Sequence, residues 1–519
     1  MTKPENISGR GLMPTRNSIA RVFRCRQLLM VLAASFTTLP LCAATGLSTN
    51  SASDQFRLMD LLGQAHPVST NAVARELQPP AAAGLGKQIP AEPKGEPAPD
   101  EVTRGIGVSK SEPRDWKWFP ATPPVLMPYL ASMDEYGNTT VQSGAVFPED
   151  PLSRYPQAAK YWLSNIGLRY SFYQSLTLAS LTGTAAGASA LQYYTATFNG
   201  KWAVAEASQG GTAGWITTAM NVQQGLSPAS RTQTPQGNLG SITDPLATVY
   251  GPNGGWISEL AWQQSFRHGQ LVVAGGLVNQ TGYLDANNYA NNSQGQFMNS
   301  ALVNSMVLPL PINNLGVNIQ WQPTDDWYLI FGTGANNQPP GSSPFTALGI
   351  SNWSYLLEFG LTPKDVFGLG PGNYRLQPFV ATVGGQTQTG VGLNLDQQLG
   401  KDSPFAWFGR FGVGGTQVTL DGARCQTATG FVMEAPLKYA GLFPGLSNDY
   451  FGAAFIWSQP SAVMEPAAHA NEYGFETTYL LQMTPVASIQ PDFQLIANPA
   501  DNPNTGCAMI FQLQLNLTW

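Results

Sequence analysis

Apolar and polar residues alternate along most of the chain from about residue 166 to its end. The final segment shows this most clearly, because every second position carries a large apolar side chain. These positions are Phe511, Leu513, Leu515, Leu517 and Trp519, and between them lie Gln512, Gln514, Asn516 and Thr518. A period of two is typical of a β-strand with one apolar face and one polar face.

The same alternation recurs upstream, for example in the segments that begin at Leu315, Trp353, Phe405 and Tyr473. The pattern predicts about sixteen strands, which begin near residues 166, 190, 213, 256, 269, 313, 326, 353, 373, 388, 405, 428, 450, 472, 486 and 508. An even number of antiparallel strands is typical of single-chain barrels in bacterial outer membranes.

The connections between these segments differ in length. Short turns are expected at residues 268–269, 323–326, 401–404 and 484–485, and long loops at 225–255, 281–312, 336–352 and 459–471. Barrels of this class place short turns in the periplasm and long loops outside. A barrel of sixteen strands encloses an aqueous channel that must be narrowed to select a solute. We therefore expect loop 225–255 or loop 281–312 to fold into the lumen.

The composition agrees with this fold. Charged residues make up 11% of the 519 residues, against about 25% in an ordinary soluble protein. The part that follows the N-terminal signal has no apolar run near the ~18 residues of a membrane helix. The sequence therefore predicts an all-β protein, a transmembrane antiparallel outer-membrane β-barrel with a disordered N-terminal leader. A secreted β-rich sugar-binding or hydrolytic protein is the alternative that composition leaves open.

The N-terminal third has a different character. Residues 1–44 read as a cleaved signal peptide, with Arg21, Arg24 and Arg26 ahead of an apolar stretch and small residues at 43–44. Residues 45–115 are a Pro- and Ala-rich leader or linker. Residues 116–165 form a pre-barrel segment without a clear period, and residues 166–519 the porin barrel. Export through the signal predicts a location in the bacterial outer membrane.

Charge and cysteine content narrow the class further. The net charge is −6, so nucleic acid is not an expected partner. Beyond the signal the chain keeps two cysteines, Cys425 and Cys507, with no CxxC motif. We expect no metal and no cofactor. Both cysteines are predicted at the outer rim, where they either form a disulfide or remain two free thiols.

The inward faces of the predicted strands carry charged and amide side chains. Sugar hydroxyls donate and accept hydrogen bonds, so such side chains are candidates for lining a sugar pathway. The candidates are Arg169, Glu259, Arg267, Glu358, Arg375, Gln377, Asp396, Arg410, Glu472, Glu476, Asp492 and Gln494, with Tyr289 from loop 281–312. The alternative is that the charges pair with one another and brace the wall.

Catalysis is not expected. Glu472 and Glu476 lie four residues apart on one strand, roughly 13 Å, which exceeds the separation of glycosidase carboxylates. The three histidines, His66, His268 and His469, fall in the leader, a turn and a loop, so a nucleophile lacks a positioned base. We interpret the chain as a channel and not an enzyme.

The C-terminal two-thirds resembles the carbohydrate-selective porin (OprB) family. The resemblance rests on the order of several stretches: 161–170 (YWLSNIGLRY), 297–302 (FMNSAL), 323–329 (PTDDWYL), 390–399 (GVGLNLDQQL), 409–412 (GRFG), 472–479 (EYGFETTY) and 489–499 (IQPDFQLIANP). It implies a sixteen-stranded barrel that admits glucose and similar sugars by passive diffusion, with a constriction of mixed charge.

Three functions are therefore weighed. The first is an outer-membrane porin for small, glucose-like sugars. The second is another barrel, either an exporter of a surface polysaccharide or a general non-selective porin. The third is the secreted β-rich protein named above. The expected partners of the first are small sugars, outer-membrane lipid, and the assembly machinery that receives the last strand, which ends at Trp519.

Overall fold

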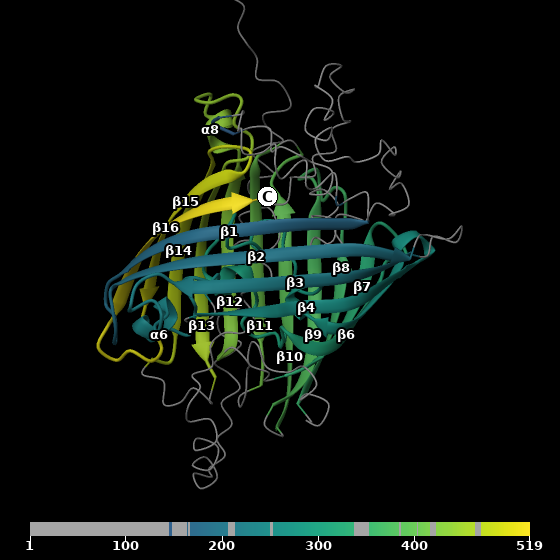
Figure 1. Cartoon of the computed structure of the whole chain (residues 1–519), viewed down its shortest axis with the longest axis horizontal. Coiled ribbons are helices and arrows are strands. Elements are labelled where there is room, and N and C mark those ends of the chain that lie inside the picture. Colours follow the sequence, from purple (N-terminus) through teal and green to yellow (C-terminus); the bar gives the residue numbers. More distant parts are fainter. Residues whose placement is uncertain are drawn as a thin grey trace, which may run out of the picture. The chain divides into compact units, whose positions relative to one another are not determined.

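Sixteen antiparallel strands close into one barrel in the computed structural model (Figure 1). The structure describes residues 145–147, 163, 167–205, 213–249, 253–336, 352–383, 386–401, 403–415, 422–461 and 469–518. The predicted signal peptide and leader, and most of the pre-barrel segment, lie outside these residues, so their limits stay predictions.

The strands follow one another around the ring, and β1 closes it against β16. Their bounds are β1 (Leu168–Leu181), β2 (Ala190–Ala205), β3 (Ala213–Gly225), β4 (Asn253–Phe266), β5 (Leu271–Val278), β6 (Asn314–Trp321), β7 (Trp327–Ala335), β8 (Trp353–Leu361), β9 (Gly372–Val383), β10 (Gln386–Gln398), β11 (Phe405–Val413), β12 (Ala423–Glu434), β13 (Tyr450–Pro460), β14 (Glu472–Gln482), β15 (Ala487–Ala497) and β16 (Cys507–Thr518).

The predicted strands are confirmed in number and in approximate position. Fifteen of the sixteen begin within three residues of the predicted start, whereas β12 begins at Ala423, five residues before the predicted start at 428. The early part of β12, with the sequence Ala-Arg-Cys-Gln-Thr-Ala-Thr, has small and polar residues on both faces. Alternation therefore gives no signal where this strand begins.

Among the described residues, helical structure is limited to short pieces in the connections between strands. They are α6 (Pro235–Leu239), η3 (Arg267–Gly269), η4 (Gln280–Gly282), α7 (Ser300–Val303) and α8 (Pro436–Tyr439). No helix within the described ranges is long and apolar enough to cross a membrane. The short pieces therefore serve as turns and caps between strands.

Burial follows the predicted alternation. In β16 the apolar positions 511, 513, 515 and 517 are exposed, and the amides between them are buried. The same two faces alternate in β6, β8 and β14. Exposed apolar side chains such as Trp262, Ile319 and Phe511 thus cover the outside of the wall. Such a continuous apolar surface is unfavourable in water and is typical of a face that meets lipid.

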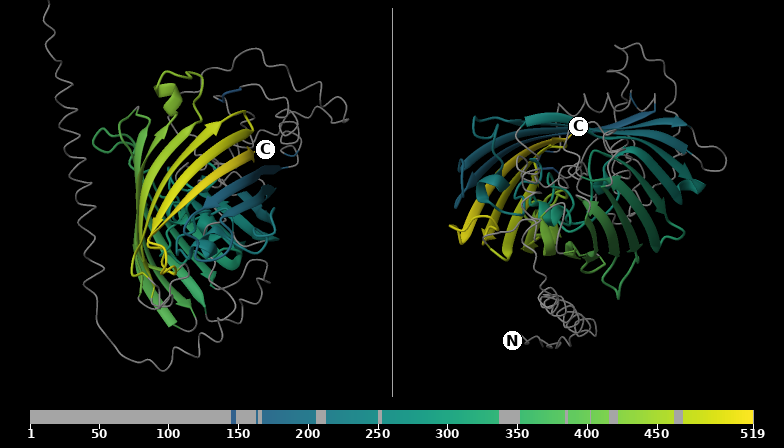
Figure 2. Two further views of the ribbon diagram at one scale, coloured as in Figure 1. Left: turned by 90° about the vertical axis from the view of Figure 1, so that its left-hand side faces the viewer. Right: turned by 90° about the horizontal axis from the view of Figure 1, so that it is seen from below.

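Two long connections run back over the inner face of the wall. The first inward segment joins β3 to β4 and is described over residues 226–249; the second joins β5 to β6 and comprises residues 279–313. Both consist mainly of buried residues. Figure 2 shows their chain inside the ring of strands. The expectation that one of the two loops folds into the lumen is met by both.

Candidate functional site

The second inward segment crosses the lumen. It leaves from β5 and returns to β6, yet Met298 and Asn299 donate their backbone N–H groups to Glu476 of β14, over 2.5 and 2.9 Å. Since β14 is the eighth strand from β6 in the ring of sixteen, these contacts join opposite sides of the barrel. The segment therefore determines how much of the lumen remains open.

Arg410 of β11 is the main attachment point of this segment. Its Nε donates to the carboxylate of Asp285 over 3.3 Å. Its Nη1 donates to the carbonyl oxygens of Ala290, over 2.7 Å, and Leu302, and its Nη2 to the carbonyl of Asp285 over 3.2 Å. Both side chains of the ion pair are fully buried. The guanidinium thus holds three points of the segment against the wall at once.

Asp285 is held from several directions. It has a positive φ of 60°, a conformation that Asp adopts more readily than most residues. Its carboxylate also accepts from the Asn394 side chain, over 2.6 Å, and from the backbone N–H of Ser305, over 2.9 Å. Loss of Arg410 would therefore remove a charged partner from a buried carboxylate.

A second charged group lies on β8, β9 and β10. Arg375 donates to Asp396 over 2.8 Å, and its Nε is 3.9 Å from Glu358. Glu358 accepts from the backbone N–H of Asp285, over 2.7 Å, and Asp396 accepts from the side chain of Asn288, over 2.8 Å. The three charged side chains pair with one another and also hold the second inward segment.

The first inward segment is attached in the same manner. Glu472 of β14 accepts from the backbone N–H groups of Ile242 and Thr243, each over 3.0 Å. The two segments also bind each other, since Ser300 donates its N–H to the carbonyl of Asp244 over 2.8 Å. Burial raises the pKa of the Asp244 carboxyl to about 7. Its Oδ1 accepts from the backbone N–H of Leu246 over 3.0 Å, so the carboxyl shapes the first segment at the point where the two segments meet.

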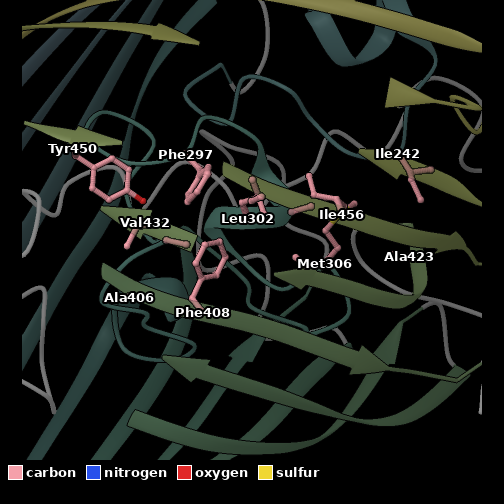
Figure 3. Packing of buried hydrophobic residues seen from close by; sticks show 14 of the residues in the cluster. Ile242, Phe297, Leu302, Met306, Ala406, Phe408, Ala423, Val432, Tyr450 and Ile456 are labelled. Atoms are coloured by element: carbon pink, nitrogen blue, oxygen red, sulfur yellow. The ribbon is translucent and has the colours of Figure 1, made fainter. Parts of the chain in front are cut away.

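Apolar packing supplements these bonds. Phe297 and Leu302 of the second segment pack on Phe408, Val432 and neighbouring side chains of the inner wall (Figure 3). The ring centroids of Phe297 and Phe408 are 5.2 Å apart. Gly452 of β13 lies beneath Phe297, and a Cβ at that position would be 2.6 Å from the ring. The wall is thus shaped to receive this aromatic side chain.

The structure places most of the predicted lining residues on the inner wall. Eleven of them are buried, inward-facing strand residues: Arg169, Glu259, Glu358, Arg375, Gln377, Asp396, Arg410, Glu472, Glu476, Asp492 and Gln494. Tyr289 lies in the second inward segment, where its carbonyl accepts from Tyr450 over 2.6 Å. Contact of any of these residues with a solute stays a prediction.

The placement of Arg267 on the inner wall is wrong. Arg267 is exposed in η3, the turn between β4 and β5, and has a positive φ of 52°. Strand alternation cannot be extended into a turn, because there the chain reverses and the side chain no longer follows the two faces of the sheet.

Four amide side chains of the inner wall are not used in attachment. They are Gln263 of β4, Asn318 and Gln320 of β6, and Asn373 of β9, and neither their nitrogen nor their oxygen atoms have a hydrogen-bond partner among the described residues. All four are buried. Gln263 and Asn318 face the same side of the sheet on either side of Ala274 of β5. These four amides add uncharged donors and acceptors to the inner wall, and their polar atoms are covered in this structure.

Of the two alternatives for Cys425 and Cys507, the bridge between them is excluded. Cys507 is an exposed free thiol at the start of β16. Cys425 is fully buried in β12, and β13, β14 and β15 separate the two strands. At roughly 4.8 Å per strand, this separation exceeds the ~7 Å limit on Cα distance for a disulfide. Within the described part of the chain, no group of three His, Cys, Asp or Glu side chains is placed to hold a metal ion.

Comparison with known proteins decides the family. The profile described as "Carbohydrate-selective porin, OprB family" matches residues 210–385 and 384–519. The chain belongs to the OprB family of carbohydrate-selective porins. Members are channel proteins, and the family and the β-barrel fold together imply the bacterial outer membrane. The family match covers β3 to β16, and with them the charged residues that hold the two inward segments.

One solved structure supports this assignment of the fold, and two other proteins show a weaker or shorter similarity. OprB of Pseudomonas putida, in its high-pH structure, has a TM-score of 0.57 and 14% identity and covers 73% of this chain and 99% of its own. OccK11 (OpdR) of Pseudomonas aeruginosa has a TM-score of 0.39 and 8% identity. An uncharacterized protein of Aquifex aeolicus is 32% identical over 93 residues, which is 18% of this chain and 26% of that protein.

Proposed function

We propose that this porin lets small, uncharged, glucose-like sugars diffuse passively across the outer membrane into the periplasm. One observation carries the proposal: several charged side chains of the inner wall hold the inward segments, whereas four neutral amides of β4, β6 and β9 do not. Arg410 and Glu476, for example, bind the second segment. Gln263, Asn318 and Gln320 have both polar atoms of each amide unpartnered among the described residues.

The chemistry of an amide suits a sugar. A sugar hydroxyl both donates and accepts hydrogen bonds, and so does each amide. The amides can therefore replace water around a passing sugar without attracting one sign of ion. Passage also requires that binding stays weak, since tight binding slows exit. Single neutral hydrogen bonds of about 1 kcal/mol each meet that requirement.

The narrowed lumen favours a diffusion channel over a conduit for a polysaccharide. The second inward segment is fixed by hydrogen bonds to β7, where Gln280 donates to the carbonyl of Thr333, and to β14 across the lumen. A polymer chain needs a continuous wide passage, whereas a monosaccharide does not. The exposed apolar outer face supports contact with outer-membrane lipid, and the regular last strand supports recognition by the assembly machinery.

Swelling of proteoliposomes in isosmotic sugars of increasing size tests the proposal. We expect fast swelling in glucose, slower swelling in a disaccharide and little in a trisaccharide. The variant Q263L/N318L should lower the glucose rate relative to the ionic conductance. Q192L, which removes an exposed amide from β2, serves as the control and should change neither. Equal rates for all sugar sizes would contradict selectivity, and no swelling at all would contradict the channel.

A further inference from the structure

A second cluster of polar side chains lies on the inner wall of β14, β15 and β16. Asp492 of β15 is directly opposite Gln512 of β16, and Gln490 is directly opposite Gln514. On the other side of Asp492 its carboxyl interacts with that of Glu476 of β14. All five side chains are at least 95% buried. We call these five residues the β15 patch.

The amide nitrogens of the β15 patch donate hydrogen bonds to groups outside the patch. Gln490 Nε2 donates to the carbonyl of Gln296, over 2.5 Å, and Gln512 Nε2 to the carbonyl of Pro245, over 2.7 Å. Because a backbone carbonyl only accepts, these bonds fix which end of each amide is the oxygen. Gln514 Nε2 donates to the hydroxyl of Thr177 over 3.1 Å. The three amide oxygens are left over.

The leftover atoms are all acceptors. The Oε1 atoms of Gln490, Gln512 and Gln514 and the Oδ2 atom of Asp492 have no hydrogen-bond partner in the described part of the chain. Neither Asp492 nor Glu476 forms an ion pair with a described Lys, Arg or His. Two buried carboxyl groups in contact repel each other, and each buried acceptor without a donor is unfavourable. A positive group between them would relieve both.

We propose that the β15 patch binds a calcium ion. Ca²⁺ takes carboxylate and amide oxygens as ligands and tolerates irregular geometry, whereas Mg²⁺ demands a near-ideal octahedron and keeps its water. Directly opposed side chains have Cβ atoms about 5 Å apart, within reach of Gln and Asp oxygens that converge on one ion. Two carboxyl groups match the charge of the ion.

The ion would also fasten the inward segments. The same amides that offer oxygen to the ion hold Pro245 of the first segment and Gln296 of the second through their nitrogens. Fixing these amides therefore fixes both segments on the β15 side of the lumen, opposite the attachment at β6. Calcium should stabilise the narrowed state whichever solute passes.

Calorimetric titration of the full-length protein in detergent with CaCl2 tests the site. We expect one ion per chain with a Kd on the order of 10⁻⁴ to 10⁻³ M, as in extracellular calcium modules. D492N keeps the shape of the side chain but removes its charge, and Q514L removes one oxygen. Each should weaken binding by roughly tenfold or more. D325N removes the same charge from an exposed turn and should bind like the wild type.

Thermal unfolding at several pH values provides the second readout. We expect Ca²⁺ to raise the unfolding temperature of the wild type and of D325N near pH 7.5, but not that of D492N. A proton shared by Asp492 and Glu476 is the competing way to neutralise the patch. It predicts a stability that falls as pH rises whether or not calcium is present. That result, an absence of binding at millimolar calcium, or unchanged binding by D492N would overturn the proposal.

Discussion

Replacing Arg410 by Met should release the second inward segment without dissolving the barrel. Met has a similar length and stays compatible with a buried site, but it cannot donate to Ala290, Leu302 or Asp285. The Asp285 carboxylate would remain buried without the guanidinium, although it would still accept from Asn394 and Ser305. The strand pairing of β11 uses backbone groups, so the wall itself should persist.

The magnitude follows from the broken pair. Removing one partner of a buried ion pair costs about 3–5 kcal/mol, because it leaves an uncompensated charge. This free energy destabilises the state in which the segment is attached to the wall. The detached state is not destabilised, because Asp285 then reaches water. At 1.4 kcal/mol per factor of ten, the attached population should fall by a factor of about 10² to 10³ relative to the detached one.

Single-channel recording in planar bilayers measures this change directly. R410M should show larger and noisier conductance than the wild type, and residues of the second segment should become accessible to added protease. D285N/R410M removes both charges and should recover part of the wild-type behaviour. R267M makes the same substitution in an exposed turn and serves as the control. Unchanged conductance with a reduced yield of assembled barrel would refute this reasoning and make Arg410 a brace of the wall.

Further expectations concern other parts of the chain. Deleting residues 45–115 while keeping the signal should leave an assembled barrel, and heat-modifiable gel mobility checks this; loss of assembly would make the leader structural. W519S should leave unassembled protein in the periplasm, so normal membrane levels would contradict a role in insertion. A maleimide should label one thiol of the folded protein, at exposed Cys507, and C507S should abolish that labelling. Burial raises the pKa of Asp244 to about 7, so ionisation of this carboxyl lowers the free energy of unfolding. That loss is absent below about pH 4, the pKa in the unfolded chain. It is complete above about pH 7. Protection of the segments from protease should therefore weaken from pH 5 to pH 8, and D244N should remove that dependence.

The strands could be predicted from the sequence because each has one face that meets an apolar phase. That constraint repeats every two residues, and it holds for β16 and β6 without exception. The prediction failed where the constraint is weak, at the start of β12, and where the chain leaves the sheet, at Arg267. The sequence could not decide whether Cys425 and Cys507 are bridged, because a shared rim does not make two strands neighbours.

The candidate site was harder to predict for a physical reason. The sequence identifies Arg410 and Glu476 as inward-facing charges, but their partners are backbone groups of a loop that lacks any period. Nothing in the residue types of positions 285–302 indicates which carbonyl or N–H group meets which strand. The free amides Asn318 and Gln320 do show a signal, since they occupy the polar positions of a clear alternation. The sequence does not indicate that their amide atoms have no hydrogen-bond partner among the described residues.

In the proposed channel, charged side chains such as Arg410 and Glu476 hold the constriction, and four neutral amides of β4, β6 and β9 remain for the solute. Swelling rates for glucose, gluconate and glucosamine, which are similar in size and differ in charge, test this arrangement most directly. With the gradients of potassium or chloride balanced, we expect neutral glucose to enter fastest. Gluconate and glucosamine should both enter more slowly, and to a similar degree. A strong preference for gluconate or for glucosamine would show that charged side chains of the wall act on the solute. That result would contradict a role for these side chains in holding the constriction alone.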